Sequence, residues 1–100
     1  MTQYIRIVGL PLEVEGLDHL QTRKLYKDFF NTYGKVILVR RSPRSREKIT
    51  GETTLEVSMH GDADEVLGLL SGTETFKEYS VYSTLDSKTL TPIICLMHIH

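Results

Sequence analysis

The sequence predicts one α+β domain in which four antiparallel strands form a sheet and two helices cover one face of it. Its 100 residues are a common size for one domain, which leaves no room for a second. Hydrophobic residues make up 40% and charged residues 25% of the chain, as in ordinary globular domains. The apolar pattern switches period along the chain, in the order strand, helix, strand, strand, helix, strand.

The chain begins with a predicted strand and helix. Residues 4–8 alternate apolar and polar side chains and run into Gly9-Leu10-Pro11, which is typical of a strand stopped by a turn. A helix is predicted over residues 18–33, with Asp18 as its N-cap and Gly34 as its stop. Its apolar side chains recur at spacings of three to five residues, as in an amphipathic helix: Leu20, Leu25, Tyr26, Phe29, Phe30 and Tyr33.

Two further strands are predicted on either side of a polar loop. Residues 36–39 form a short apolar run rich in β-branched side chains, and residues 53–57 alternate apolar and polar side chains. Between them, residues 40–48 are polar and interrupted by Pro43, which indicates a loop.

A second helix and a fourth strand complete the predicted domain, residues 1–85. The helix ends at Gly72, and residues 79–84 alternate as the strand. The apolar face of this helix consists of Ala63, Val66, Leu67 and Leu70. Residues 86–100 are an extension whose apolar run we expect to be either a fifth strand or a lid.

This order of elements is the split βαβ, or ferredoxin-like, arrangement, which leaves one sheet face free of helices. Three groups of residues also have the spacing of a known family. They are the segment 5–11, the set Tyr26, Phe29, Phe30, Tyr33, Gly34 and Val36, and the set Ala63, Val66, Leu67, Leu70 and Gly72. On this spacing, residues 3–85 resemble the RNA-recognition motif (RRM), a family of RNA-binding domains.

The resemblance implies a ribonucleoprotein or RNA-processing role, with single-stranded RNA stacked on aromatic rings of the free sheet face. The corresponding positions here are Arg6, Glu52 and Thr54, none of which is aromatic, so the chain would be an atypical member. Alternation along the third strand adds Glu56 to that face, where two carboxylates would repel phosphates. We expect Arg6 to pair with one of these glutamates.

Basic residues are concentrated in the first half of the chain. Residues 1–50 contain ten Lys or Arg and five Asp or Glu, whereas residues 51–100 contain two and eight. Five cations lie in the predicted loop: Arg40, Arg41, Arg44, Arg46 and Lys48. Because guanidinium groups suit phosphates, we predict that this basic segment binds RNA, together with Arg6 and Tyr82. The alternative is a solvated loop, and phosphorylation of Ser42 or Ser45 would reduce its charge.

A second hypothesis is a protein-interaction module without direct RNA binding. The missing aromatic side chains favour it, as do Val8 and Ile37, which we expect to be exposed. The apolar residues 92–97 would either cover the free sheet face or offer a strand for self-association.

The sequence contains no recognisable catalytic or cofactor motif, and we predict neither enzymatic activity nor a bound cofactor. The Cys95, His98 and His100 cluster is a weak zinc pattern without a fourth ligand. With one cysteine, no secretory signal and no apolar run of roughly 18 residues, we expect an intracellular protein that does not enter the membrane. A nuclear location is implied by the resemblance alone.

Overall fold

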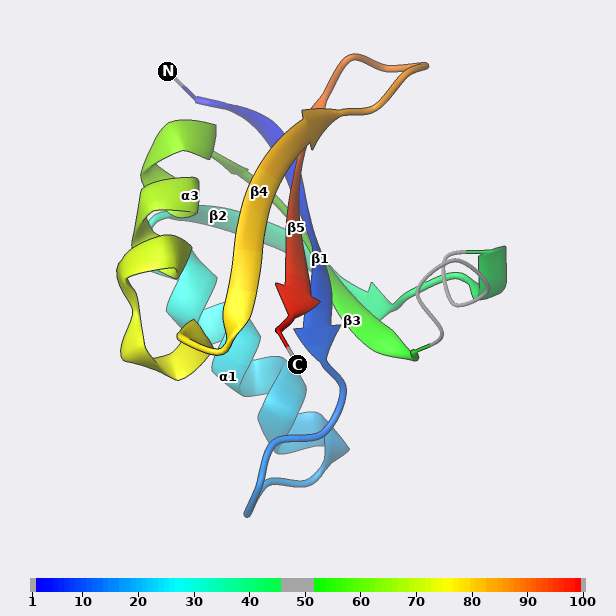
Figure 1. The fold of residues 1–100 in the computed structure, drawn as a ribbon, viewed down its shortest axis with the longest axis vertical. Helices are drawn as coiled ribbons and strands as arrows, with labels where there is room; N and C mark the ends of the chain where they lie inside the picture. Colours follow the sequence, from blue (N-terminus) through cyan, green and yellow to red (C-terminus); the bar gives the residue numbers. More distant parts are fainter. Residues whose placement is uncertain (1, 46–51, 100) are drawn as a thin grey trace.

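The computed structural model describes residues 2–45 and 52–99, which form one mixed five-stranded sheet with two α-helices on one face (Figure 1). In chain order the elements are β1 (Gln3–Pro11), α1 (His19–Asn31), β2 (Gly34–Arg41), β3 (Thr54–Gly61), α3 (Ala63–Gly72), the 3-10 helix η1 (Glu74–Phe76), β4 (Tyr79–Leu85) and β5 (Pro92–His98). Within this part of the chain, no helix is long and apolar enough to cross a membrane.

The predicted four-stranded, fully antiparallel sheet is wrong in strand number and in strand order. The order is β2-β3-β1-β5-β4, and β5 pairs in parallel with β1 while it pairs antiparallel with β4. The hairpin that follows β4 therefore inserts β5 between β4 and β1. Ile93 and Ile94 are both buried although they lie on opposite faces, which suits a central strand.

The position of β5 decides between the alternatives for the C-terminal extension. Residues 92–97 form a strand, so the fifth-strand prediction is confirmed and the lid alternative is wrong. Residues 92–97 do not form a free strand in the described structure, because β5 is hydrogen-bonded to a neighbouring strand on each side.

Gly9 allows β1 to bend beside β5. The β1–β3 register shifts between Ile7 and Leu10, and Gly9 has a φ of +88° at this irregularity. A Cβ atom at Gly9 would overlap the carbonyl oxygen of Leu96 in β5. Glycine is thus required here both for its conformation and for the close approach of the two backbones.

The start of α1 was predicted more accurately than its end or its exposed surface. Asp18 is the N-cap, as predicted, and the structure adds a capping box in which Gln21 takes part. The helix ends at Asn31, and Gly34 is the first residue of β2 rather than the helix stop. Leu20 is 79% exposed, so the predicted apolar stripe extends beyond the part of the helix that packs.

The main core lies between the sheet and the two helices. Ile5, Ile7 and Val57 from the sheet pack there with Phe30 of α1 and Val66 of α3. The hydroxyl of Tyr26 donates a 2.8 Å hydrogen bond to the carbonyl oxygen of Pro11, which ties α1 to the end of β1. The opposite face of the sheet carries no described helix (Figure 1), and its side chains are the candidates for function.

Candidate functional site

The strand registers arrange the open face, the sheet face opposite the helices, into rows of side chains. Cross-strand partners project from the same face, so Arg6 shares one row with Ser58 and Ile93. The open face consists of Tyr4, Arg6, Val8, Lys35, Leu38, Arg40, Thr54, Glu56, Ser58, His60, Ser80, Tyr82, Thr84, Ile93, Cys95 and Met97.

One row combines two aromatic rings with a cation across three strands. Tyr4 of β1 and Lys35 of β2 both pair with His60 of β3. The rings of Tyr4 and His60 meet edge to face, with centroids 5.8 Å apart and an interplanar angle of 71°. His60 and Lys35 are exposed and also line a hollow of about 550 Å³ at this end of the sheet, whose lining includes the acidic residues Asp62 and Glu65 as well. This row thus presents stacking surface and positive charge together.

Sequence reasoning missed Tyr4 and His60 as site residues. The resemblance to the RRM family directed attention to Arg6, Glu52 and Thr54 instead. The period of two along a strand was the available signal, because Tyr4 is two residues from Arg6 and His60 is four residues from Glu56.

Arg6 lies on the open face as predicted, but the ion pair in the described structure is made by a different arginine. Arg40 of β2 lies opposite Glu56 of β3, and its Nη2 is 3.6 Å from Glu56 Oε2. The Glu56 side chain is 1% exposed, so its charge is paired and shielded by burial. The expected repulsion of phosphates by two carboxylates on the sheet is therefore absent at Glu56, and Glu52 lies outside β3.

The predicted basic segment does not form one patch within the described residues. Arg40 and Arg41 belong to β2, and their registers with Glu56 and Leu55 place them on opposite faces of the sheet. Arg44 is exposed and lies three residues after the end of β2. The other two predicted cations, Arg46 and Lys48, lie outside the described residues.

Ser42 has a structural role at the end of β2. It is buried, its amide donates to the carbonyl oxygen of Thr54 at 2.8 Å, and its Oγ lies 2.8 Å from the Oγ1 of Thr54. The folded chain therefore hides the hydroxyl that we considered for phosphorylation, whereas Ser45 is exposed. Val8 is similarly only 5% exposed, which corrects its interpretation as an exposed apolar residue.

Tyr82 lies at the far end of the open face, as predicted. It is 45% exposed and sits directly opposite Cys95 in the β4–β5 ladder. The negative charge of an ionised Cys95, together with partial burial, raises the pKa of Tyr82 above its ordinary value. One strand, β5, lies between Tyr82 and Tyr4, and two strands, β5 and β1, lie between Tyr82 and His60.

The C-terminal cysteine and histidine residues do not form a common metal site in the described structure. Cys95 lies on the open face, whereas His98 lies on the helix side, where its ring is 5.0 Å from that of Tyr79. His100 lies outside the described residues, and no group of three or more potential metal ligands occurs within them.

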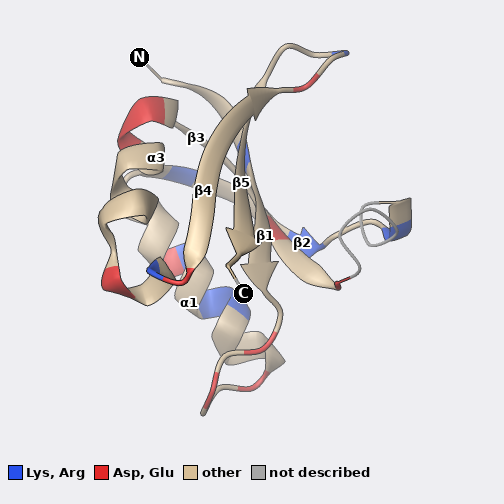
Figure 2. Cartoon of the chain, viewed as in Figure 1, with Lys and Arg blue, Asp and Glu red and all other residues tan. Residues whose placement is uncertain are grey.

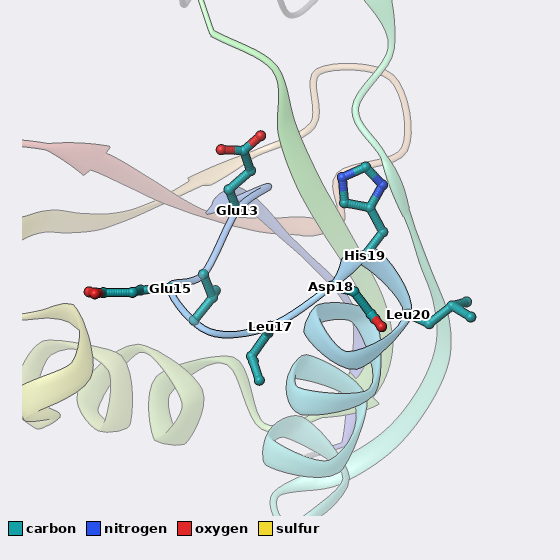
Figure 3. Close-up of a pocket in the computed structure, with 7 residues that line it drawn as sticks. Glu13, Glu15, Leu17, Asp18, His19 and Leu20 are labelled. Carbon is teal, nitrogen blue, oxygen red and sulfur yellow. The ribbon is translucent and has the colours of Figure 1, made fainter.

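The hollow drawn in Figure 3 lies between the β1–α1 loop and the start of α1 and has a volume of about 820 Å³. The Glu13 and Glu15 side chains point in different directions (Figure 3). Asp18 Oδ1 accepts the amide hydrogen of Gln21 and is occupied in capping α1. We assign this hollow no catalytic or binding role, because the carboxylates that line it do not converge on one point.

Comparisons with protein-family models, with curated proteins and with solved structures found no match.

Proposed function

We propose that this chain is an RRM-like, non-enzymatic module that binds single-stranded RNA on the open face. The observation that carries the proposal is the Tyr4–His60 ring pair with Lys35 in the same row and Arg6 in the next. The course of the chain from β1 to β4 supports a ferredoxin-like fold. In that fold the fourth strand runs antiparallel to the first, and β4 runs antiparallel to β1 here. In this proposal β5 is an insertion into that fold.

Base stacking and phosphate contacts would each contribute to the affinity for RNA. A base placed on the exposed His60 ring would gain roughly 1–3 kcal/mol, as for other base–aromatic stacks. Lys35 and Arg6 lie on the two sides of that position along the sheet and would contact the flanking phosphates. Arg40 contributes less, because its charge is paired with the Glu56 carboxylate.

The distribution of charged residues over the surface supports the open face as the RNA-binding surface. Acidic residues colour the start of α3, the 3-10 helix η1 and the loop before α1 (Figure 2), whereas Lys35, Arg6 and Arg40 project from the open face. An RNA strand that approaches the open face would therefore avoid most of the acidic side chains of the helix layer. Two phosphate contacts, by Lys35 and Arg6, would give a log–log salt slope of roughly −1.4 for a single strand.

The first prediction separates stacking from general attraction. Tyr4→Leu and His60→Gln should each weaken binding of a random RNA of about ten nucleotides by roughly tenfold, since each removes one stacking ring. Fluorescence anisotropy at two salt concentrations measures the affinity. His19→Gln replaces an exposed histidine at the start of α1 and is the matched control, with unchanged affinity expected.

Two results would contradict the proposed site. Full affinity in both ring variants, with loss on Arg44→Gln, would move the contact to the basic segment. Absence of binding at low salt would reject RNA binding and favour the protein-interaction hypothesis, for which Ile37 and Leu38 on β2 are 50% and 49% exposed.

A further inference from the structure

The outer edge of β4 offers backbone hydrogen-bonding groups. Among the strands that the structure describes, β4 pairs with β5 alone. The amide of Asp86 donates to Thr91 and that of Ile99 donates to Glu78, so residues 78 and 86 face β5 through their backbones. Antiparallel ladders alternate in this respect, and the outward residues are therefore those at odd numbers. They are Tyr79, Val81, Ser83 and Leu85.

The two edges of the sheet differ in their protection against pairing with another strand. Edge strands are usually protected by charged side chains, proline or a bulge. β2 has Lys35, Arg40 and Arg41 and a register irregularity between Val36 and Leu38. β4 contains no charged residue or proline, and its seven residues pair with β5 in one continuous register.

β4 is also exposed beyond its backbone. Ser83 projects toward the helix side, by its register with Ile94, yet it is exposed, so the helix layer does not cover this part of the strand. Leu85, on the same face, is 60% exposed. An apolar side chain beside an unprotected edge indicates a surface that another strand can bury.

We propose that β4 is a homodimer interface, at which β4 strands of two copies pair antiparallel about a two-fold axis at Ser83. This register sets Val81 of one copy against Leu85 of the other, twice, and gives both leucines an apolar partner. It also brings Glu78 of each copy toward Lys88 of the other. An axis at Tyr82 would instead set Glu78 against Asp86, two like charges.

The charged side chains favour pairing with a second copy of the chain at the β4 edge and disfavour it at the β2 edge. Self-pairing of β2 would bring Lys35 of one copy against Arg40 or Arg41 of the other, and directly opposed like charges are destabilising. Pairing at β4 opposes uncharged side chains within the strand and opposite charges at its ends. Such dimers would have a continuous ten-stranded sheet with both open faces on the same side.

The test uses the whole chain and measures its mass by sedimentation equilibrium over a range of concentrations. One pair of strands is a small interface, so we expect a dissociation constant on the order of 100 μM. Ser83→Lys sets two ammonium groups against each other at the axis and should weaken the dimer more than tenfold. Ser71→Lys, at an exposed position of α3, is the matched control.

A charge exchange tests the register. Glu78→Lys and Lys88→Glu should each weaken the dimer several-fold, and the double variant should restore it. Circular dichroism and thermal melts report whether each variant is folded, which matters for Glu78 because it lies 3.7 Å from His98. A wild-type chain that stays monomeric at about 1 mM would overturn the proposal. With a dissociation constant on the order of 100 μM, most of the protein would be dimeric at that concentration.

A dimer that resists Ser83→Lys would equally overturn the proposal. The dimer stands independently of RNA binding, because no β4 residue belongs to the Tyr4–His60 row. A monomer that binds RNA would contradict the dimer proposal alone, and a dimer that does not bind RNA would contradict the RNA-binding proposal alone.

Discussion

At the scale of single residues, Gly9 and Tyr26 fix the path of β1. Gly9 lets β1 approach the backbone of β5, and Tyr26 holds the end of β1 against α1 through the carbonyl oxygen of Pro11. The first residue is needed because it lacks a side chain, and the second because its hydroxyl is buried with a partner. Both are accessible to single substitutions.

Gly9→Ala should lower the free energy of unfolding by about 2–4 kcal/mol, measured from urea denaturation. The new methyl group would meet Leu96 and would also occupy a left-handed backbone conformation. Gly16→Ala is the control, because Gly16 has a similar φ of +82° but open space around its Cβ position. A cost of only about 1 kcal/mol is expected there. Equal costs at the two sites would show that the close approach to Leu96 is unimportant.

Tyr26→Phe should cost about 1 kcal/mol at neutral pH, because it removes the hydrogen bond to Pro11. Burial raises the pKa of Tyr26 well above its ordinary value of 10.0. Below about pH 10, the folded and unfolded chains both keep the phenol proton of Tyr26. Above it the unfolded chain loses the proton more readily, so stability falls as the pH rises past about 10. The variant should lose less stability than wild type between pH 9 and pH 11.

Denaturant midpoints across that pH range measure this effect. Tyr33→Phe, which removes a phenol group just after α1, serves as the control. If Tyr26→Phe loses stability above pH 10 as steeply as wild type, burial of this phenol does not contribute to alkaline unfolding.

Residue-scale predictions from the sequence were correct where local chemistry decides the outcome. The Asp18 cap depends on hydrogen bonds within one helical turn, and it was identified from neighbouring residues. Leu20 and Val8 were placed wrongly because their exposure depends on which distant segments pack over them. The Arg40–Glu56 pair was missed for the same reason, since it depends on the register between β2 and β3.

At the scale of elements, the periods of apolar residues revealed nearly every helix and strand, although their ends shifted by several residues. β2 extends to Arg41 and β3 to Gly61, beyond the segments predicted from alternation. The extension occurs because a partner strand continues to supply backbone hydrogen bonds after the side-chain pattern has weakened. This is why two arginines expected in a loop belong to a strand.

β5 should be indispensable for folding. A chain that ends at Asp86 lacks the three buried side chains of Ile93, Ile94 and Leu96, together with the hydrogen bonds that β5 makes to β1 and β4. We expect the shortened chain to lose cooperative thermal unfolding, because the loss exceeds the 5–15 kcal/mol that is about the total stability of a domain. Removal of residues 99 and 100 is the control and should leave a folded protein. A cooperative transition in the shorter chain would show that β5 is dispensable.

At the scale of the whole molecule, the net charge of −1 conceals an uneven distribution of charge over the surface. The open face carries Lys35, Arg6 and a neutralised Arg40–Glu56 pair, whereas much of the acidic charge lies around α3 and before α1 (Figure 2). The sequence showed this asymmetry only as a difference between its halves. In the fold, the basic residues of the first half are divided between the open face and α1, which contains Arg23, Lys24 and Lys27 (Figure 2). RNA binding is our proposal for the open face.

The order of the sheet was the part of the fold least accessible from sequence. Residues 6–8 of β1 pair with residues 93–95 of β5, so a strand near the start of the chain depends on one near its end. Local patterns identify both strands, but they contain no information about which of β4 and β5 adjoins β1. The four-stranded ferredoxin-like arrangement predicts that β4 adjoins β1. The additional hairpin places β5 there instead.

The central position of β5 also has a consequence for the order in which the molecule is made. A ribosome synthesises β1 first and β5 last among these strands, and the two must pair before the sheet is continuous. Until His98 has left the exit tunnel, the nascent chain holds β1 with one edge open and β4 without its neighbour. Such edges bind other strands readily, which makes this interval the period when misassembly is easiest. A chaperone that shields β1 during translation would therefore protect this fold more than one that acts after release.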